Sequence, residues 1–210
     1  MYFFTTGNFE HDCEQIKVQL SKVSKVVVLG GDGTLHLAVN ALIGSHCSLA
    51  LLPCGTGNDF SRGFDCHIEQ WRQALFNPPI AIDIGKINTR YFINIAGVGF
   101  DAHVVKAINA KACFSAFDYS WVSAKELLYY NAQQLKGVFS TQTMQYPNLI
   151  TVFANHKYFG GGLKIAPNAD LSDGQLECYQ MRSGGVFYNV LSFIKLLFKR
   201  HQHIQNLTYS

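Results

Sequence analysis

The sequence predicts an α/β domain followed by a β-rich domain that also contains helices. Two observations carry this prediction: a strand–turn–helix–strand–turn pattern over residues 26–60, and closely spaced strand-like segments after residue 79. The composition agrees, since 48% of the 210 residues are hydrophobic and 15% are charged, as in a protein with a buried core. The formal net charge of +3 is too small to indicate a nucleic-acid partner.

The chain opens on residues 2–6, which are rich in aromatic residues and threonine and predict a strand. Residues 11–23 then predict a helix with regularly spaced apolar positions. A doubly wound domain rarely starts on a bare strand. We therefore interpret the abrupt start as the loss of a preceding strand–helix unit.

Two glycine turns organise the first domain. The turn Gly30-Gly31-Asp32-Gly33-Thr34 follows the apolar run 26–29, and a second glycine turn follows the apolar run 49–52. Residues 35–43 predict the connecting helix, which Gly44 ends. The two runs are therefore expected to be parallel strands whose turns share the carboxyl edge of the sheet, where open α/β sheets bind ligands.

The residue types in these turns suit a nucleotide bound with a metal ion. Successive glycines let backbone N–H groups converge on an anion, and the following helix adds its positive end. Asp32 would repel a phosphate unless a cation lay between them, which implies Mg²⁺. The second turn adds donors at Thr56 and Asn58, a carboxylate at Asp59 and a cation at Arg62. An ordinary tight turn remains the alternative for the first turn taken alone.

The domain boundary is expected where prolines end a helix. Residues 68–76 predict a helix that Asn77-Pro78-Pro79 stops, so we divide the chain into residues 1–79 and 80–210. Residues 80–96 then predict a β-hairpin around residues 88–90. Within it, Asp83 is more simply a polar anchor at a strand end than a catalytic group.

The second domain is predicted to mix helices and strands. Residues 104–136 predict an aromatic-rich helical region, whose aromatic stripe either packs in the core or lines a lipid groove. Further strands are expected at residues 143–146, 149–155 and 176–181, and the glycines at 160–162 imply a close approach of backbone.

The last predicted helix covers residues 186–199 and ends in basic residues. It either faces the core or touches an anionic lipid surface. His201 and His203 alone do not indicate a metal site. No apolar run approaches the ~20 residues needed to span a bilayer.

Five motifs of this sequence occur in a known order. They are Gly30-Gly31-Asp32-Gly33-Thr34, Pro53-x-Gly55-Thr56-x-Asn58-Asp59-Phe60-x-Arg62, Asn94-x-x-Gly97-x-Gly99-Phe100-Asp101-Ala102, Gly160-Gly161-Gly162, and Ala166-Pro167-x-Ala169-x-x-x-Asp173-Gly174-x-Leu176. In these motifs the chain resembles the diacylglycerol kinase catalytic domain family, in its bacterial lipid kinase branch, which is related in fold to NAD kinases. The resemblance implies transfer of the γ-phosphoryl group of ATP to a lipid hydroxyl, with diacylglycerol as the default acceptor and ATP and Mg²⁺ as cofactors.

The resemblance also implies roles for particular residues. Asp32 and Asp59 are the implied catalytic carboxylates, which hold or orient Mg²⁺–ATP. The implied nucleotide-binding residues are Thr5, Thr6, Gly30, Gly31, Asp32, Gly33, Thr34, Gly55, Thr56 and Asn58. A separate Mg²⁺ site is implied at Asp170 and Gln175 through carbonyl oxygens and at Asp173 through its carboxylate. On spacing alone, an ordinary Asp-Gly turn explains that loop more simply.

Three departures from the family pattern lower the expected activity, and one of them is the missing strand–helix unit at the start. His36 and Leu37 stand where relatives have Asn-Glu, and the glutamate helps to bind nucleotide. The family's proposed general base lies in an Asp-Gly-Glu segment that does not occur before Ser210. We therefore interpret the chain as truncated at both ends and weakly active. A non-catalytic nucleotide- or lipid-binding protein and an NAD kinase-like enzyme are the alternatives. The expected location is cytoplasmic, with peripheral contact to the inner membrane face.

Overall fold

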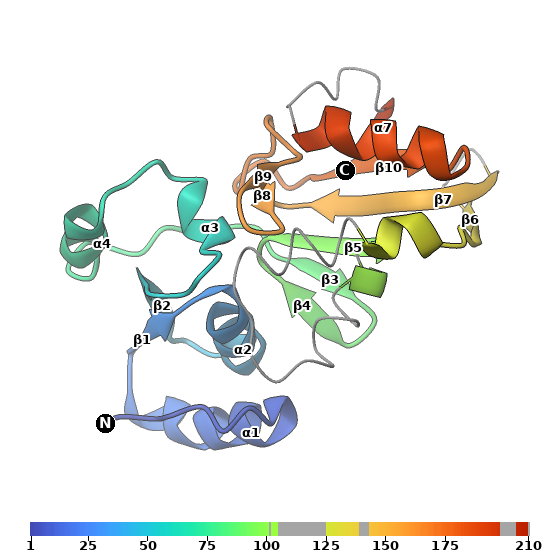
Figure 1. Cartoon of the computed structure of the whole chain (residues 1–210). Helices are drawn as coiled ribbons and strands as arrows, with labels where there is room; N and C mark the ends of the chain where they lie inside the picture. The colour runs from blue at the N-terminus through green and yellow to red at the C-terminus, as the bar shows by residue number, and fades with distance from the viewer. Residues whose placement is uncertain (101, 105–124, 139–142, 198–204, 210) are drawn as a thin grey trace.

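The computed structural model describes residues 1–210 except 101, 105–124, 139–142, 198–204 and 210. It has two lobes (Figure 1). The first is built around a small parallel sheet, and the second around a larger antiparallel sheet. The expected fold class, an α/β domain followed by a β-rich domain with helices, is confirmed.

The first residues of the chain correct one sequence prediction, because residues 2–6 form no strand. Their polar groups bond locally instead. Thr6 donates its backbone N–H and its hydroxyl to the two carboxylate oxygens of the buried Asp12, at 2.9 and 2.7 Å. A strand needs a partner to pair with, and this segment lies along the following helix rather than beside the sheet (Figure 1).

The first helix is close to its predicted position. Helix α1 (Phe9–Gln19) begins after Asn8, whose side-chain oxygen accepts a hydrogen bond from the N–H of His11. The 3₁₀ turn η1 (Leu20–Lys22) completes it. The predicted helix therefore starts two residues earlier than expected and tightens in its last turn.

The predicted crossover unit is present. Strand β1 (Lys25–Gly30) runs parallel to β2 (Ser48–Pro53), with Gly30 opposite Pro53 at their carboxyl ends. Helix α2 (Asp32–Leu42) connects them and packs its apolar side on the sheet. Both glycine turns consequently leave the sheet at the same edge.

Two short helices follow the second turn. Helix α3 (Asp59–Arg62) is a single turn, and α4 (Ile68–Ala74) ends two residues before the predicted limit. The α4 N-terminus is held by Gln70, whose side-chain oxygen accepts from the N–H of His67 at 2.8 Å.

The predicted hairpin is present but shorter than expected. It consists of β3 (Gly85–Ile87) and β4 (Arg90–Phe92), joined through Asn88 in a left-handed conformation with φ 52°. Residues 80–84 are not a strand, because Asp83 donates its N–H to the carbonyl of Leu171 rather than to a neighbouring strand. The hairpin packs against α2.

The second lobe is an antiparallel sheet in the order β11-β10-β7-β5, with β6 paired to the other end of β7. Its strands are β5 (Ile95–Gly99), β6 (Gln134–Val138), β7 (Thr143–Ala154), β10 (Leu176–Arg182) and β11 (Gln205–Tyr209). A small hairpin of β8 (Tyr158–Phe159) and β9 (Leu163–Lys164) carries the glycines at 160–162, and helix α7 (Val186–Leu197) covers the sheet (Figure 1).

The predicted helical region 104–136 is only partly correct. Residues 125–129 are helical, but residues 134–136 belong to β6. In β6 the backbone N–H and C=O groups form hydrogen bonds with β7, whereas in a helix they would bond within the segment. Most of the aromatic stripe, like His201 and His203, lies outside the described residues. Within the described part, no helix is both long and apolar enough to cross a bilayer.

Each lobe has its own hydrophobic core. The first combines α1, α2, β1 and β2 with residues of the β3–β4 hairpin, and the second lies on the larger sheet. Leu171 is an exception, because it comes late in the chain but is buried in the first core. The loop that contains it therefore connects the two lobes.

Candidate functional site

The two glycine turns meet back to back. A Cβ atom added to Gly31 would lie 2.9 Å from the Cα atom of Gly55, and a Cβ added to Gly55 would overlap the backbone of Gly31. Only residues without side chains can approach so closely. The expectation that both turns share one edge of the sheet is correct, and their backbones form a single corner there.

The second turn is closed by its own asparagine. Asn58 has a left-handed backbone with φ 51°, and its side chain faces back toward Gly55. Its Oδ1 accepts from the N–H of Gly55 at 2.9 Å, and its Nδ2 donates to the carbonyl of the same residue at 2.6 Å. The Asn58 amide, expected to contact a nucleotide, is thus used to hold the turn in shape.

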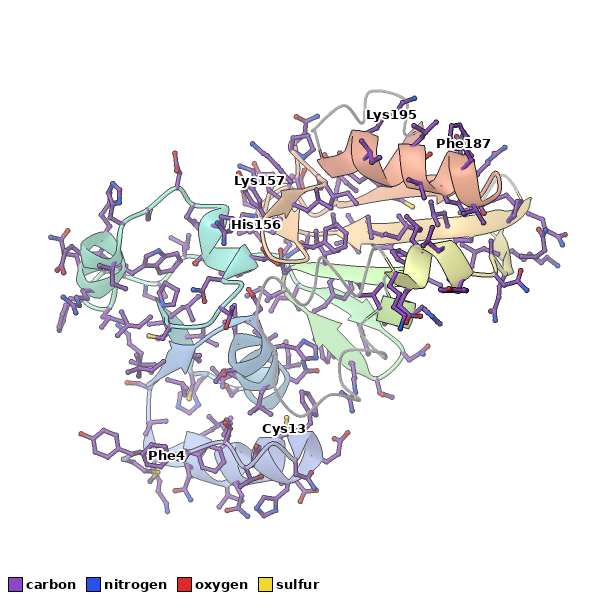
Figure 2. All side chains as sticks on the ribbon, in the orientation of Figure 1. Phe4, Cys13, His156, Lys157, Phe187 and Lys195 are labelled. Carbon is purple, nitrogen blue, oxygen red and sulfur yellow. The ribbon has the colours of Figure 1, made fainter. Side chains whose placement is uncertain are left out.

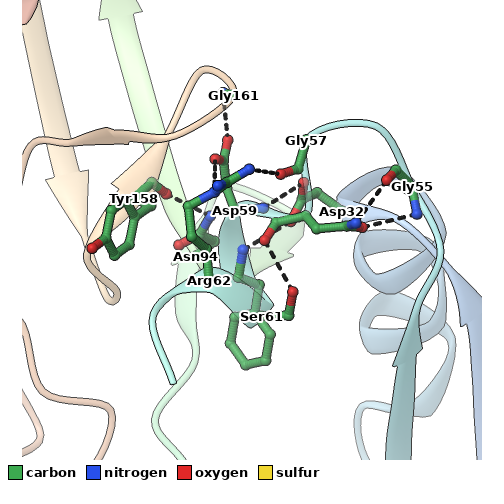
Figure 3. Close-up of polar contacts among 11 residues, drawn as sticks. Asp32, Gly55, Gly57, Asp59, Ser61, Arg62, Asn94, Tyr158 and Gly161 are labelled. Carbon is green, nitrogen blue, oxygen red and sulfur yellow. Dashed lines mark hydrogen bonds and ion pairs between the residues drawn. The ribbon is translucent and has the colours of Figure 1, made fainter. Parts of the chain in front are cut away.

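Asp32 joins the first turn to the second (Figure 3). One carboxylate oxygen accepts from the N–H of Asp59 and the other from the N–H of Phe60, both at 2.9 Å. These are the first N–H groups of α3, which have no partner within the helix. Asp32 therefore fixes the position of Asp59, a role that the sequence did not indicate.

Asp59 joins the second turn to the other lobe. Its side chain is buried, and Oδ2 accepts from the N–H of Gly161 at 2.8 Å (Figure 3). Its other oxygen, Oδ1, is buried without a hydrogen bond. Burial raises the pKa of the Asp59 carboxyl; the Gly161 N–H acts in the opposite direction, and the nearby Asp32 carboxylate adds to the rise.

Arg62 lies beside these groups. Its Nη2 donates to the carbonyl of Gly57 at 2.8 Å, while its Nε lies 3.9 Å from Oδ1 of Asp59. A Cβ on Gly162 would lie 3.5 Å from the guanidinium carbon, so the arginine lies against the 160–162 turn. The three glycines at 160–162 have positive φ angles, so the turn itself favours glycine. A Cβ on Gly161 would meet no atom within 4 Å, so the close approach of backbone expected there stays a prediction.

The lobes also pack through aromatic rings below this corner. The buried His156, from the second lobe, lies against the rings of Phe60 and Phe64 with centroids 5.2 and 5.1 Å apart. A Cβ on Gly63 would overlap the imidazole. Nearby, Asn94 donates its Nδ2 to the carbonyl of Tyr158 at 2.8 Å, which holds the β8–β9 hairpin in place (Figure 3).

Several predicted nucleotide-binding residues surround the corner. Gly33 is exposed, with no atom within 4 Å of the position where its Cβ would be, and Thr56 is exposed at the tip of the second turn. Thr34 lies in the first turn of α2, with its hydroxyl near Gly30. Their contact with a nucleotide stays a prediction.

Thr5 and Thr6 are the predicted residues that the structure does not bring to the corner. Both lie in the segment beside α1, well apart from the glycine turns (Figure 1), and Thr6 bonds to Asp12. Their expected place at the nucleotide rim depended on a strand that does not form. Their contact with a nucleotide therefore stays a prediction that the position of this segment does not support.

The two positions at which the sequence departs from the family pattern pack against apolar side chains. Leu37 is buried in the first core, and His36 packs on the ring of Phe9 with centroids 5.5 Å apart. Burial, and to a smaller extent the Arg90 charge, lowers the pKa of His36. Neither side chain replaces the Asn-Glu pair expected there.

The predicted metal loop, residues 170–175, contains an exposed carboxylate that bonds within the loop itself. Asp170 is exposed, and its Oδ1 accepts from the N–H and the hydroxyl of Ser172, bonds that lower the pKa of its carboxyl. Asp173 accepts from the N–H of Gln175 at 2.9 Å. No cluster of three or more His, Cys, Asp or Glu side chains that could hold a metal occurs among the described residues. A site formed partly by carbonyl oxygens stays a prediction.

The interpretation of Asp83 as a polar anchor is confirmed by its hydrogen bonds. Its Oδ2 accepts from the N–H of Gly174 at 2.7 Å, and its carbonyl accepts from the side chain of Asn155 at 2.7 Å. The bond from Gly174, together with the one from the N–H of Asp83 to the carbonyl of Leu171, ties the Asp170–Gln175 loop to the segment before the β3–β4 hairpin.

Two family models together match most of this chain. The diacylglycerol kinase catalytic domain matches residues 4–87, and a C-terminal NAD kinase β-sandwich-like domain matches residues 94–196. The chain therefore belongs to the diacylglycerol kinase catalytic domain family.

Two curated relatives illustrate the relationship. A protein of Shewanella frigidimarina named "Probable lipid kinase YegS-like" is 32% identical over 177 residues, which are 79% of this chain and 57% of that protein. A diacylglycerol kinase of Mycobacterium tuberculosis is 30% identical over 176 residues, which are 75% of this chain and 55% of the relative. The chain thus spans little more than half the length of these relatives.

The fold is also that of a solved structure. A diacylglycerol kinase from Bacillus anthracis superposes with a TM-score of 0.71 at 22% identity, covering 99% of this chain and 71% of that one. At this identity the match supports the fold alone.

Proposed function

We propose that this protein is an ATP-dependent lipid kinase that transfers the γ-phosphoryl group of ATP to a lipid hydroxyl. The observation that carries the proposal is the corner where Gly31 and Gly55 meet at the carboxyl edge of β1 and β2, with Asp32 and Asp59 beside it. Open α/β sheets bind ligands at this edge. The names of the relatives, lipid kinase and diacylglycerol kinase, support the same activity.

In this proposal the glycine turns bind the phosphates through backbone N–H groups. The chemistry of Asp59 fits a metal ion, because its buried Oδ1 has no hydrogen bond and Mg²⁺ prefers oxygen ligands. Bound Mg²⁺ neutralises phosphate charge during transfer. Asp32 acts mainly by holding Asp59 and the start of α3, and Arg62 places a positive charge at the same corner.

We further propose that residues 80–210 present the lipid acceptor, with diacylglycerol as the default, and that residues 1–79 bind the nucleotide. The Asp170–Gln175 loop is proposed as the separate Mg²⁺ site. Because its acceptor lies in a bilayer and ATP is cytoplasmic, the enzyme acts at the inner membrane face. The loss of the Asn-Glu pair at His36 and Leu37 supports weak nucleotide binding and low activity.

The test is transfer from radiolabelled ATP to lipids in mixed micelles. We expect label on a lipid, and roughly a hundredfold less label with Asp32→Asn, because an asparagine can accept only one of the two N–H groups and Asp59 is displaced. Asp65→Asn, a change of an exposed aspartate on the same lobe, is the matched control and should match wild type.

Three results would contradict the proposal in different ways. Label on NAD but not on lipid would indicate the NAD kinase-like alternative. Nucleotide binding by calorimetry without transfer to any acceptor would indicate a non-catalytic binding protein. Full activity of Asp32→Asn would remove Asp32 from the site.

A further inference from the structure

The outer side of helix α7 is apolar. Phe187, Leu191 and Ile194 are spaced four and three residues apart, which places them on one side of the helix, and they are 79%, 42% and 42% exposed. Val186 and Tyr188 extend this surface at the start of the helix and are about half exposed. A surface helix of a globular protein normally carries polar residues on this side.

The orientation of α7 is fixed by a polar residue on its inner side. Asn189 is only 2% exposed, and its Oδ1 accepts from the N–H of Gly184 and the hydroxyl of Ser183, both at 3.1 Å. Val190 packs on the second core beside it. Rotating the helix to bury Phe187 would break these buried hydrogen bonds, so the apolar surface is held outward.

The charge of this region is positive. Between Arg182 and Ser210 the sequence contains four Lys or Arg residues and no Asp or Glu. One of the four, Lys195, is exposed and projects from α7 on the same side as Phe187, away from the sheet (Figure 2). Residues 94–210 carry ten basic and six acidic residues, whereas residues 1–93 carry seven and eight. The positive charge of the protein is therefore concentrated in the lobe that carries α7.

We propose that α7 is a docking helix that lies on an anionic phospholipid surface. The side chains of Phe187, Leu191 and Ile194 enter the boundary between headgroups and acyl chains, and Lys195 contacts lipid phosphates. An apolar stripe with an aromatic residue, with Lys195 beside it and no acidic residue in the helix, is the pattern of a helix that binds in the plane of a membrane. The inference rests on the proposed function, since it brings the kinase to a bilayer that holds its acceptor.

The experiment is co-sedimentation of the 210-residue protein with vesicles, without nucleotide. We expect binding to phosphatidylcholine vesicles that contain phosphatidylglycerol and much weaker binding to phosphatidylcholine alone. The double variant Phe187→Ser with Leu191→Ser should bind roughly tenfold more weakly. Lys195→Gln should reduce binding to the anionic vesicles roughly fivefold and leave binding to neutral vesicles unchanged.

The matched control is Phe76→Ser, which removes an equally exposed phenylalanine, 87% exposed, from the first lobe. It should bind vesicles as wild type does, and circular dichroism melts should be unchanged for all variants. Wild-type binding by the double variant would overturn the proposal. So would a stable wild-type dimer that the double variant converts to monomer, because α7 would then face a second copy of the chain.

Failure of this inference and failure of the proposed kinase activity give different results. Transfer to a short-chain, water-soluble diacylglycerol tests the kinase without a membrane, and the double variant should retain it fully. Vesicle binding without any transfer would leave α7 as a docking helix and remove the kinase. Transfer without vesicle binding would support the kinase activity and contradict the docking role of α7.

Discussion

The glycine corner and the Asp170–Gln175 loop look alike in the sequence, since both place carboxylates beside glycines, but the structure treats them differently. Asp59 is buried and bonds to Gly161, 102 residues away. Asp170 is exposed and bonds to Ser172, two residues away. An acidic residue in a glycine turn therefore tells us only that a carboxylate is present. Whether that carboxylate is buried depends on contacts with residues distant in sequence.

The largest expected effect is a break in the corner itself. Gly55→Ala should lower the free energy of unfolding by about 3 kcal/mol, because its new Cβ would overlap the backbone of Gly31, and two backbones cannot separate cheaply. Gly33→Ala is the control, since no atom lies within 4 Å of the added Cβ, and it should stabilise α2 by about 0.5 kcal/mol. Urea unfolding of both variants measures the difference. Equal effects would mean that the two turns do not meet as described.

A smaller effect concerns the buried carboxylate. The pKa of Asp59 is raised by burial, so its contribution to stability is present below the unfolded pKa near 3.8 and is lost as the pH rises through the folded value. Asp59→Asn removes this cost of ionisation. We expect the variant to be about 1 kcal/mol more stable than wild type at pH 7, although it should lose kinase activity.

Urea unfolding from pH 4 to pH 8 checks this second prediction. The difference in the free energy of unfolding between Asp59→Asn and wild type should grow as the pH rises. A difference that stays constant over the whole range would show that burial of the Asp59 charge carries no cost.

The smallest effect is expected at the exposed loop. In Mg²⁺ without nucleotide, the melting temperature of wild type should rise by about 2 °C, and Asp173→Asn should lose this rise while melting as wild type does without Mg²⁺. Its amide oxygen can still accept from the N–H of Gln175, so the turn is kept. Asp170→Asn retains its backbone carbonyl and serves as the control. An unchanged Mg²⁺ response of Asp173→Asn would remove the proposed loop site.

The sequence was sufficient where a pattern is local. The apolar runs and glycine turns predicted β1, α2 and β2, because strand, turn and helix preferences are set by neighbouring residues. The same holds for the last helix, α7. The sequence prediction was wrong at residues 2–6, where the composition favoured a strand. A strand forms only where it has a partner to pair with.

The candidate site was predictable in its residue types but not in its connections. Nothing in the sequence indicates that Asp32 bonds to the N–H groups of Asp59 and Phe60, since these lie 27 and 28 residues away. The three glycines at 160–162 indicated a tight turn, but the partner of the Gly161 N–H, Asp59, comes from the other lobe. Such pairings follow from packing between lobes, which no local pattern encodes.

The imidazole between the lobes has a consequence for acid tolerance. Burial, and then the Lys157 charge, lowers the pKa of His156 to about 4 (Figure 2 shows both residues). Its contribution to stability is therefore complete above the unfolded pKa of 6.5 and declines as the pH falls from there toward 4. Since its ring packs on Phe60 and Phe64 of the first lobe, protonation of His156 destabilises the contact between the two lobes. Acidification below pH 6.5 therefore lowers the stability of the packing between the two lobes, across which Gly161 also donates to Asp59.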